Sequence, residues 1–305
     1  MSEYTFSNNL LKLYTNKNSN IFSQAGKLAC KDLVGKIGII YDDYDYKGNL
    51  KDLWKKDNLD NIFIIAPRRK TISMDDKIMF HKKMKDSVYT PESYLSSDDI
   101  TDKSCLYFVK KTDSTGGLGV NIFNYDDLLK IDTTNCVIQK NIFNPDLYQN
   151  KRYKIRQLVF LYKNKVYLYK NSFFVSSNIN YGNIPNDKLR DTHVINQSNN
   201  SCSLFEMSNK LENFDLILTN IILAVNDFKN YYQTEIKTVT DNDYGVLGFD
   251  FIVDEQKNVQ IIEINHRSNY RHPTNVSIDC DVGFIKDMIK LLNSNNIENT
   301  LFEII

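Results

Sequence analysis

Residues 248–254 are Gly-Phe-Asp-Phe-Ile-Val-Asp, and residues 261–265 are Ile-Ile-Glu-Ile-Asn. A short polar segment separates these two apolar runs, a pattern that predicts a β-hairpin. Glu263 and Asn265 are two residues apart on one strand, so they point to the same face of the sheet. Asp250 on the partner strand can reach that face as well. Because these side chains offer hard oxygen ligands, the hairpin predicts a Mg²⁺ site.

The composition is that of an ordinary globular protein and excludes several classes of function. The chain has 305 residues, 42% hydrophobic and 25% charged, enough for one large domain or two to three small ones. Its net charge is zero, so we expect neither nucleic-acid nor membrane binding. The five cysteines are scattered without a C-x-x-C pair, which favours a reducing compartment. With no signal-peptide or transmembrane pattern, we expect a cytoplasmic protein.

The remaining sequence alternates between short apolar runs and amphipathic stretches. We expect strands at 36–41, 62–66, 106–110 and 136–140, a hairpin of 155–162 with 165–170, and helices at 50–57, 74–86, 124–130, 209–232 and 281–292. Most neighbouring strands would pair antiparallel. The pattern therefore predicts an α+β fold and not a doubly wound parallel sheet.

A glycine-rich loop, Thr-Asp-Ser-Thr-Gly-Gly-Leu-Gly at 112–119, follows the strand that ends in Lys110. Gly116, Gly117 and Gly119 would let backbone N–H groups approach phosphate oxygens, and Lys110 could reach the same phosphates. The loop is neither a P-loop nor a G-x-G-x-x-G motif, and taken alone it is better read as an ordinary hairpin turn. Beside the acidic hairpin it predicts a nucleotide whose phosphates are bridged by a metal.

Six blocks of sequence, taken together, match the motifs of a known family in their order and spacing. They are Asp76-Lys77 with Pro91-Glu92-Ser93-Tyr94, the run 108–119, the run 137–145, Arg152-Tyr153-Lys154-Ile155-Arg156, Thr192-His193-Val194-Ile195-Asn196, and 248–265. These blocks resemble the ATP-grasp superfamily, and in detail its tubulin–tyrosine ligase branch. The last block is the most specific, since it matches G-F-D-F-x-V-D-E…L-I-E-V-N without a gap.

The resemblance implies a fold and an activity. It implies an ATP-grasp fold in which two α+β subdomains hold the nucleotide, with an N-terminal α/β domain at 1–75, a central subdomain at 76–141 and a C-terminal subdomain at 142–305. It implies an ATP- and Mg²⁺-dependent carboxylate–amine ligase that acts through an acyl phosphate. The reaction would add a free amino acid to an acidic protein or peptide tail, possibly that of tubulin.

The resemblance also assigns roles to individual residues. Asp250, Glu263 and Asn265 would hold Mg²⁺, and Arg156 would join Glu263 and Asn265 in catalysis. Lys77 and Lys110 would neutralise the phosphates of the nucleotide, and Gln139, Lys140 and Ile142 would border its adenine. The full set of residues that would bind the nucleotide is Lys77, Lys110, Gly116, Gly117, Gly119, Gln139, Lys140, Ile142, Arg152, His193 and Asn196.

Two positions depart from the branch. Val175 stands where the branch has a catalytic arginine, for which Lys170 or Arg190 could substitute, and Lys154 replaces an aspartate credited with ribose contact. These departures leave two alternatives open: a ligase for a non-tubulin peptide or a small molecule, and a pseudo-ligase that binds ATP without turnover. A basic stretch, Arg68-Arg69-Lys70 with Lys82, Lys83 and Lys85, is read as a solvated face or as a docking patch for an acidic tail.

Overall fold

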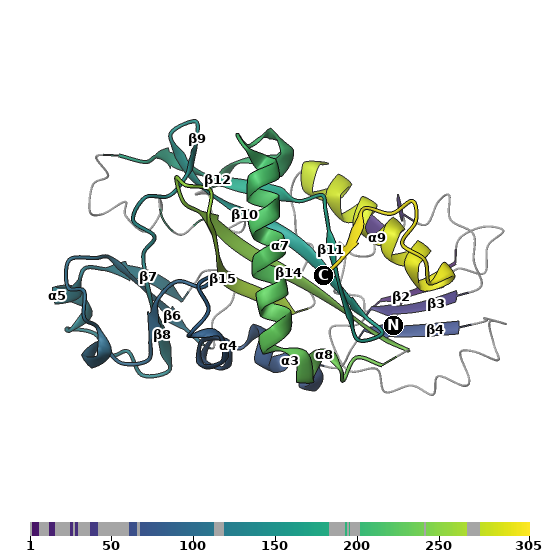
Figure 1. Cartoon of the computed structure of the whole chain (residues 1–305), viewed down its shortest axis with the longest axis horizontal. Helices are drawn as coiled ribbons and strands as arrows, with labels where there is room; N and C mark the ends of the chain where they lie inside the picture. The colour runs from purple at the N-terminus through teal and green to yellow at the C-terminus, as the bar shows by residue number, and fades with distance from the viewer. Residues whose placement is uncertain are drawn as a thin grey trace.

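The computed structural model shows a large mixed sheet, a small antiparallel sheet, and helices packed against both (Figure 1). It describes residues 2–5, 12–15, 25–26, 28–29, 37–41, 61–65, 68–112, 119–182, 193, 195, 202–240, 242–266 and 275–305. The predicted helix at 50–57 lies outside these residues. The mixture of helices with mostly antiparallel strands confirms the predicted α+β class.

The predicted hairpin forms the centre of the large sheet. It consists of β14 (Asp243–Val253) and β15 (Val259–His266), which pair antiparallel with Asp250 opposite Glu263 and Gly248 opposite Asn265. Directly opposed residues on neighbouring strands share a face, so the two acidic side chains do converge. The pairing register shifts immediately after Asp250. On its other edge β14 pairs antiparallel with β10 (Lys151–Tyr162).

The remaining strands extend this sheet in both directions. Its order is β1 (Ser2–Thr5), β2 (Lys12–Thr15), β3 (Ile37–Tyr41), β4 (Asn61–Ile65), β14, β10, β11 (Lys165–Tyr169) and β16 (Phe302–Ile304), with β9 (Leu147–Tyr148) and β12 (Phe173–Asn180) on β10 and β13 (Cys202–Met207) on β12. The strands β2, β3 and β4 are parallel, and β4 joins β14 in parallel at Asp243 and Tyr244. The N-terminal strands therefore continue the large sheet, while the division into three domains stays a prediction.

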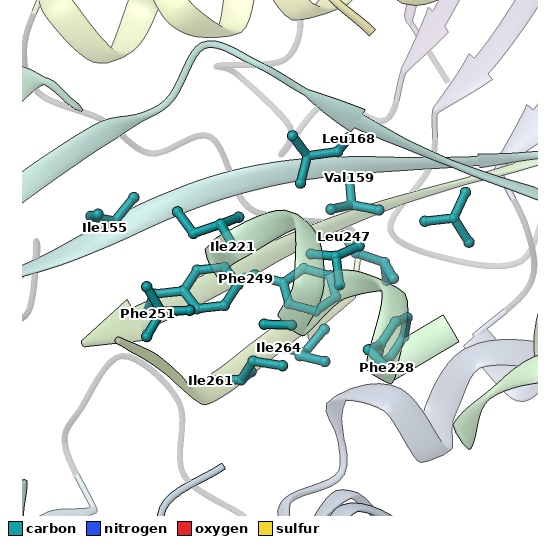
Figure 2. Packing of buried hydrophobic residues seen from close by; sticks show 14 of the residues in the cluster. Ile155, Val159, Leu168, Ile221, Phe228, Leu247, Phe249, Phe251, Ile261 and Ile264 are labelled. Carbon is teal, nitrogen blue, oxygen red and sulfur yellow. The ribbon is translucent and has the colours of Figure 1, made fainter. Parts of the chain in front are cut away.

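Two long helices cover opposite faces of the large sheet. Along β10, Val159 and Leu161 pack with residues of α7 (Phe214–Tyr231), whereas Leu158 and Phe160 pack with residues of α9 (Asn275–Ser294). Successive side chains of a strand point to opposite faces of the sheet, so alternate residues of β10 pack against the two helices. Figure 2 shows the α7 side, where Ile221 and Phe228 lie against the apolar side chains of β14 and β15. Burial of each such side chain contributes roughly 1.5–3 kcal/mol to the free energy of unfolding.

The small sheet carries its own core at one end of the molecule. It consists of β5 (Ser93–Tyr94), β8 (Cys136–Lys140), β6 (Tyr107–Lys111) and β7 (Val120–Phe123), all antiparallel. Next to it lies α5 (Tyr125–Leu128), at the site of the predicted helix 124–130. After β8 the chain crosses to the large sheet, where the Asp146 N–H donates to Val253 O at 2.8 Å. This contact fixes the small sheet beside the tip of the central hairpin.

The helix predicted at 74–86 is wrong in its bounds. The chain forms α3 (Arg68–Asp75) and α4 (Lys77–Met84), separated by Asp76 in an extended conformation. The Asp76 carboxylate accepts a 2.8 Å hydrogen bond from the Met79 N–H, so it caps α4 instead of continuing one helix. Capping by an aspartate interrupts a helical pattern without proline or glycine. The break places Lys77 in the first turn of α4.

Several further elements complete the described structure. Short turns form at η1 (Ser97–Asp99) and η3 (Ser208–Lys210), and α8 (Gln233–Ile236) follows α7. The predicted helix at 209–232 therefore begins later, and that at 281–292 begins earlier, within α9. The sequence did not predict β12, whose buried Ser176 and Ser177 interrupt the apolar pattern. None of the helices in the described ranges has the length and apolarity to span a bilayer.

Candidate functional site

A cleft opens between the small sheet and the central strands of the large sheet. Its empty space, including the part that is open to solvent, measures about 750 Å³. The lining residues are Lys77, Pro91, Phe108, Lys110, Val120, Gln139, Lys140, Ile142, Arg152, Lys154, His193, Ile195, Ile252, Ile262 and Glu263. Of the residues predicted to bind a nucleotide, these seven line the cleft although they are distant in sequence: Lys77, Lys110, Gln139, Lys140, Ile142, Arg152 and His193.

Strand geometry explains why the charged side chains converge. Arg152, Lys154 and Arg156 alternate along β10, so all three point to the same face. Phe108 and Lys110 stand in the same relation on β6, whose sheet faces β10 across the cleft. The cleft therefore has a cationic floor and partly apolar walls, which suits a ligand with an anionic part and an aromatic part.

Arg152 is a buried cation without a counter-ion among the described residues. Its side chain is 1% exposed and donates one 2.8 Å hydrogen bond, from Nη1 to Asn141 Oδ1, while its Nε has no hydrogen-bond partner. The guanidinium lies 5.7 Å from the centre of the Phe108 ring. Burial lowers the pKa of Arg152 to about 10, with Tyr181 opposing the shift. A buried guanidinium is costly unless an anion pairs with it, so the cleft fits a phosphate-bearing ligand.

Lys110 connects the two sheets across the cleft. Its Nζ donates to Gln139 Oε1 at 2.6 Å within the small sheet and to Ile262 O at 2.9 Å on β15. Burial lowers the pKa of Lys110 to about 8, partly offset by the Glu263 carboxylate. The ammonium thus lies between the predicted adenine side, at Gln139, and the predicted metal side, at Glu263.

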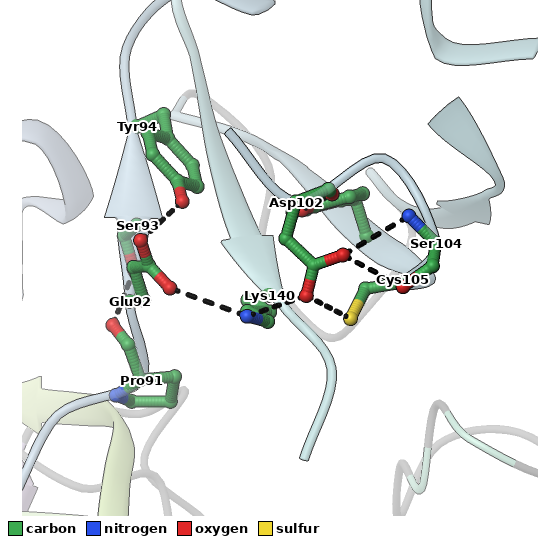
Figure 3. Close-up of polar contacts among 9 residues, drawn as sticks. Pro91, Glu92, Ser93, Tyr94, Asp102, Ser104, Cys105 and Lys140 are labelled. Atoms are coloured by element: carbon green, nitrogen blue, oxygen red, sulfur yellow. Dashed lines mark hydrogen bonds and ion pairs between the residues drawn. The ribbon is translucent and has the colours of Figure 1, made fainter. Parts of the chain in front are cut away.

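Lys140 lines the cleft and also belongs to a polar network on the small sheet (Figure 3). Its Nζ lies 2.9 Å from Asp102 Oδ2 and 3.4 Å from Glu92 Oε2. Asp102 also accepts a hydrogen bond from the Cys105 thiol at 2.9 Å, and Glu92 accepts one from the Tyr94 hydroxyl. The bond to Asp102 raises the pKa of Lys140. These ion pairs hold the ammonium where β5, β6 and β8 meet.

Asp250 lies beneath the cleft and is already neutralised by two cations. Its Oδ1 accepts a 2.6 Å hydrogen bond from Arg156 Nε, and its Oδ2 accepts bonds from Lys154 Nζ at 2.9 Å and Arg156 Nη2 at 3.2 Å. Burial alone would raise the pKa of Asp250, but Arg156 and Lys154 bring it below its usual value. The carboxylate shares a sheet face with Glu263, as the sequence predicts. It is not among the residues that line the cleft, because Arg156 and Lys154 occupy its two oxygens.

Glu263 and Asn265 retain oxygen atoms that could bind a metal. Glu263 is half-buried and lines the cleft, and Asn265 Nδ2 makes a long 3.4 Å contact with Gly248 O. A carboxylate and an amide oxygen beside a phosphate-binding cleft fit Mg²⁺, which keeps several ligands from water and substrate phosphates. Within the described residues no group of three His, Cys, Asp or Glu side chains gathers at one point.

A second hollow of about 490 Å³ lies on the α4 side of Lys110. It shares Lys77, Lys110, Gln139 and Glu263 with the cleft, and its other walls include Met74, Phe80 and Met84. The two hollows are therefore neighbouring parts of one opening between α4, β6, β8 and β15.

The remaining predicted residues differ in how far the structure places them. His193 is buried, with its ring 6.4 Å from that of Phe108 and 5.7 Å from that of Tyr181. Gly119 O accepts a 3.0 Å hydrogen bond from the Lys111 N–H at the end of β6. Gly116, Gly117 and Asn196 lie outside the described residues.

The structure shows the environment of most positions at which the sequence departs from the tubulin–tyrosine ligase branch. Val175 is fully buried on β12, opposite Lys154 on β10. Lys170 is half-exposed and pairs with Glu303 at 3.5 Å, and it is not among the residues that line the cleft. Arg190 lies outside the described residues. Among the described residues at these positions, Lys154 lines the cleft, whereas Val175 and Lys170 do not.

The predicted basic docking patch is partly neutralised. Lys70 forms an ion pair with Asp243, and Lys83 forms one with Glu235. Lys82 is exposed on α4, and Lys85 is exposed at the C-cap of this helix. This distribution agrees better with a solvated face than with a concentrated anion-binding surface.

The family resemblance placed Lys154 where an aspartate contacts ribose but gave the lysine no role of its own, and sequence reasoning missed several apolar residues of the cleft. Lys154 lies between Arg152 and Arg156 on β10, and Phe108 lies two residues before Lys110 on β6. A consistent use of the strand period of two would have placed both in the site. Nothing local marks Ile195 or Ile252, because their position depends on how the two sheets meet.

Comparison with known proteins agrees with this geometry. The family model described as the tubulin-tyrosine ligase family matches residues 42–298, which is most of the chain. A search among curated proteins found no match. The matched region includes the small sheet, the central strands of the large sheet, and the hairpin with Asp250 and Glu263. The chain therefore belongs to the tubulin-tyrosine ligase family, within the ATP-grasp-like superfamily, and has the α+β fold of that group.

Proposed function

We propose that this chain is an ATP- and Mg²⁺-dependent carboxylate–amine ligase that adds an amino acid to a protein or peptide tail. Membership of the tubulin-tyrosine ligase family supports a ligase of that kind. The observation that carries the proposal is Arg152, a buried guanidinium in the cleft without a carboxylate partner in the described structure. Lys77, Lys110 and Lys154 line the same cleft, which gives it the positive charge that a triphosphate needs.

The proposed reaction has two displacements. A carboxylate oxygen of one substrate attacks the γ-phosphorus of ATP, so that an acyl phosphate forms and ADP leaves. The amine of the second substrate then attacks the acyl carbon, which forms the amide and releases inorganic phosphate. Mg²⁺ would neutralise charge that develops on the phosphates. The protein's own contribution is to orient the phosphates with Arg152 and Lys110 and to exclude water with the apolar walls.

Residues at the cleft divide into two groups by the part of ATP that they suit. Gln139, Ile142, Phe108 and Ile252 supply amide and apolar surface for adenine, and Lys77, Lys110 and Arg152 supply charge for phosphates. Glu263 and Asn265 would hold the metal. Arg156 lies beside Asp250 at the edge of the cleft and would face the transferred phosphoryl group.

The nucleotide half of the proposal is tested by thermal unfolding with Mg²⁺–ATP. A ligand that binds only the folded state raises the melting temperature, whatever the second substrate is. We expect a rise that requires Mg²⁺ and is lost in Glu263→Gln. Absence of any shift at millimolar Mg²⁺–ATP would overturn the nucleotide site.

The acceptor half needs a separate experiment. Labelled tyrosine, glutamate and glycine would be offered with Mg²⁺–ATP to tubulin and to unrelated acidic peptides. Labelling of tubulin supports a tubulin ligase, and labelling of another peptide alone supports a different acceptor. The buried Val175 favours one further candidate, a pseudo-ligase, which ATP binding without ADP release under any condition would support. We also expect a reducing compartment such as the cytosol, since Cys105 and Cys280 form no disulfide among the described residues.

A further inference from the structure

The contacts of Asp250 do not fit the role of a metal ligand. Both of its oxygens accept charged hydrogen bonds, Oδ1 from Arg156 at 2.6 Å and Oδ2 from Lys154 at 2.9 Å. Its side chain is completely buried, and one negative charge therefore faces two positive charges. A divalent cation at Asp250 would have to displace one of these donors and then lie against the other.

Glu263 offers the opposite environment on the neighbouring strand. It stands directly across from Asp250, is half-buried, and lines both hollows of the opening. In the described structure its carboxylate makes no ion pair as close as those of Asp250. The two acids of the hairpin thus share a face but differ in the space that each leaves for a cation.

Lys154 is the residue that creates this difference. Its ammonium is held on Oδ2 of Asp250, with a side chain that is 11% exposed and that also lines the cleft. Arg156 also interacts with the buried Asp281, but at Asp250 itself Arg156 and Lys154 place two positive charges on one carboxylate, one more than that carboxylate requires. That surplus charge lies at the edge of the space where anionic phosphates would bind.

We propose that the Lys154 ammonium takes the place of a metal ion at Asp250, so that Glu263 and Asn265 hold a single divalent cation. Asp250 is then a positioning residue, which fixes Arg156 and Lys154 toward the cleft and does not ligate the metal. This inference rests on the proposed function, because it needs a nucleotide–metal complex in the cleft.

The experiment counts bound Mn²⁺ by electron paramagnetic resonance in the presence of a non-hydrolysable ATP analogue. We expect one Mn²⁺ per wild-type chain and at least tenfold weaker Mn²⁺ binding in Glu263→Gln. In Lys154→Met, Oδ2 of Asp250 loses its shorter hydrogen bond and keeps only the 3.2 Å contact from Arg156, which still balances the charge. That variant should bind a second Mn²⁺, or bind the first at least fivefold more tightly. Lys165→Met on β11, an exposed lysine, serves as the matched control and should match wild type.

Each other outcome is decisive. Two Mn²⁺ ions on the wild-type chain, or a Lys154→Met variant with wild-type Mn²⁺ binding, would overturn the inference and leave the nucleotide site standing. A wild-type chain that binds no analogue would instead overturn the proposed function and this inference with it. Asp250→Asn supplies a second readout: if it folds, its Mn²⁺ affinity should stay within threefold of wild type, and a tenfold loss would contradict the proposal.

Discussion

Val175 of β12 lies directly opposite Lys154 of β10, and the two side chains therefore share one face of the large sheet. Val175 is fully buried among apolar residues that include Phe173 and Phe284, whereas Lys154 extends toward Asp250 and the cleft. Position 175 is thus part of the core under α9, and the positive charge at this point of the sheet belongs to the neighbouring strand.

Replacement of Val175 by arginine should destabilise the protein and should not improve any ligase activity. The new guanidinium would be buried beside Lys154 with no carboxylate of its own, and burial of an unpaired charge costs about 3 kcal/mol or more. Denaturant unfolding of Val175→Arg should show this loss, and Val88→Arg, at a site that is 79% exposed, should show almost none. A Val175→Arg protein of wild-type stability would mean that the side chain can reach solvent or the cleft.

Replacement of Arg152 by methionine should separate ligand binding from stability. The buried guanidinium has no carboxylate partner in the described structure, so the ligand-free variant should be as stable as wild type or more stable. Loss of a charged hydrogen bond to phosphate should weaken ATP binding about 10- to 100-fold. Thermal unfolding with and without Mg²⁺–ATP measures both quantities.

The control for Arg152 is Lys130→Met, which removes an exposed cation that does not line the cleft. It should leave both the melting temperature and the ATP-induced shift unchanged. If Arg152→Met lowered the stability of the ligand-free protein and left ATP affinity intact, the guanidinium would be a structural group and not an anion site.

Local patterns predicted the parts of this structure that depend on neighbouring residues. The hairpin of β14 and β15 follows from two apolar runs and a polar turn, in which Asp254 Oδ1 accepts the Asn258 N–H at 2.8 Å as expected of a turn aspartate. Strand alternation placed Glu263 and Asn265 on one face. The convergence of Lys110 and Arg152 on one cleft followed from the family resemblance, because no local pattern relates β6 to β10.

The features that sequence reasoning missed depend on distant pairings. The bond between Lys154 and Asp250 joins residues 96 positions apart, and only the register of β10 with β14 brings them together. The edge strand β16 pairs with β11 through three residues, too few to give a recognisable pattern. The break between α3 and α4 arises because Asp76 caps the N-terminus of α4. The sequence on both sides of Asp76 has a helical pattern, so the break could not be recognised from it.

Replacement of Phe249 by alanine should test the core that supports the hairpin. Phe249 is fully buried, with its ring 5.0 Å from that of Phe228 on α7 and 5.9 Å from that of Phe251. The resulting cavity should cost about 3–5 kcal/mol of unfolding free energy. Leu216→Ala on α7, at a position 49% exposed, should cost far less in the same denaturant titration. Equal losses would show that α7 does not pack on the hairpin through this face.

The pKa of Lys110 predicts how stability varies with pH. Burial lowers this pKa from 10.5 to about 8, so below pH 8 the lysine is charged in both the folded and the unfolded chain. Between about pH 8 and 10.5 the folded chain has lost this proton and the unfolded chain retains it. Because the unfolded chain then binds more protons, the contribution of Lys110 to the free energy of unfolding rises with pH across this window.

Comparison with Lys110→Met isolates that contribution from other groups that titrate at alkaline pH. The difference in unfolding free energy, wild type minus variant, should increase from pH 7 to pH 10 and should stay constant from pH 6 to pH 7. Lys165→Met, which removes an exposed lysine, should show no such trend relative to wild type. A difference that is flat up to pH 10 would mean that the Lys110 ammonium is not desolvated between the two sheets, and it would remove the electrostatic reason for placing a phosphate beside it.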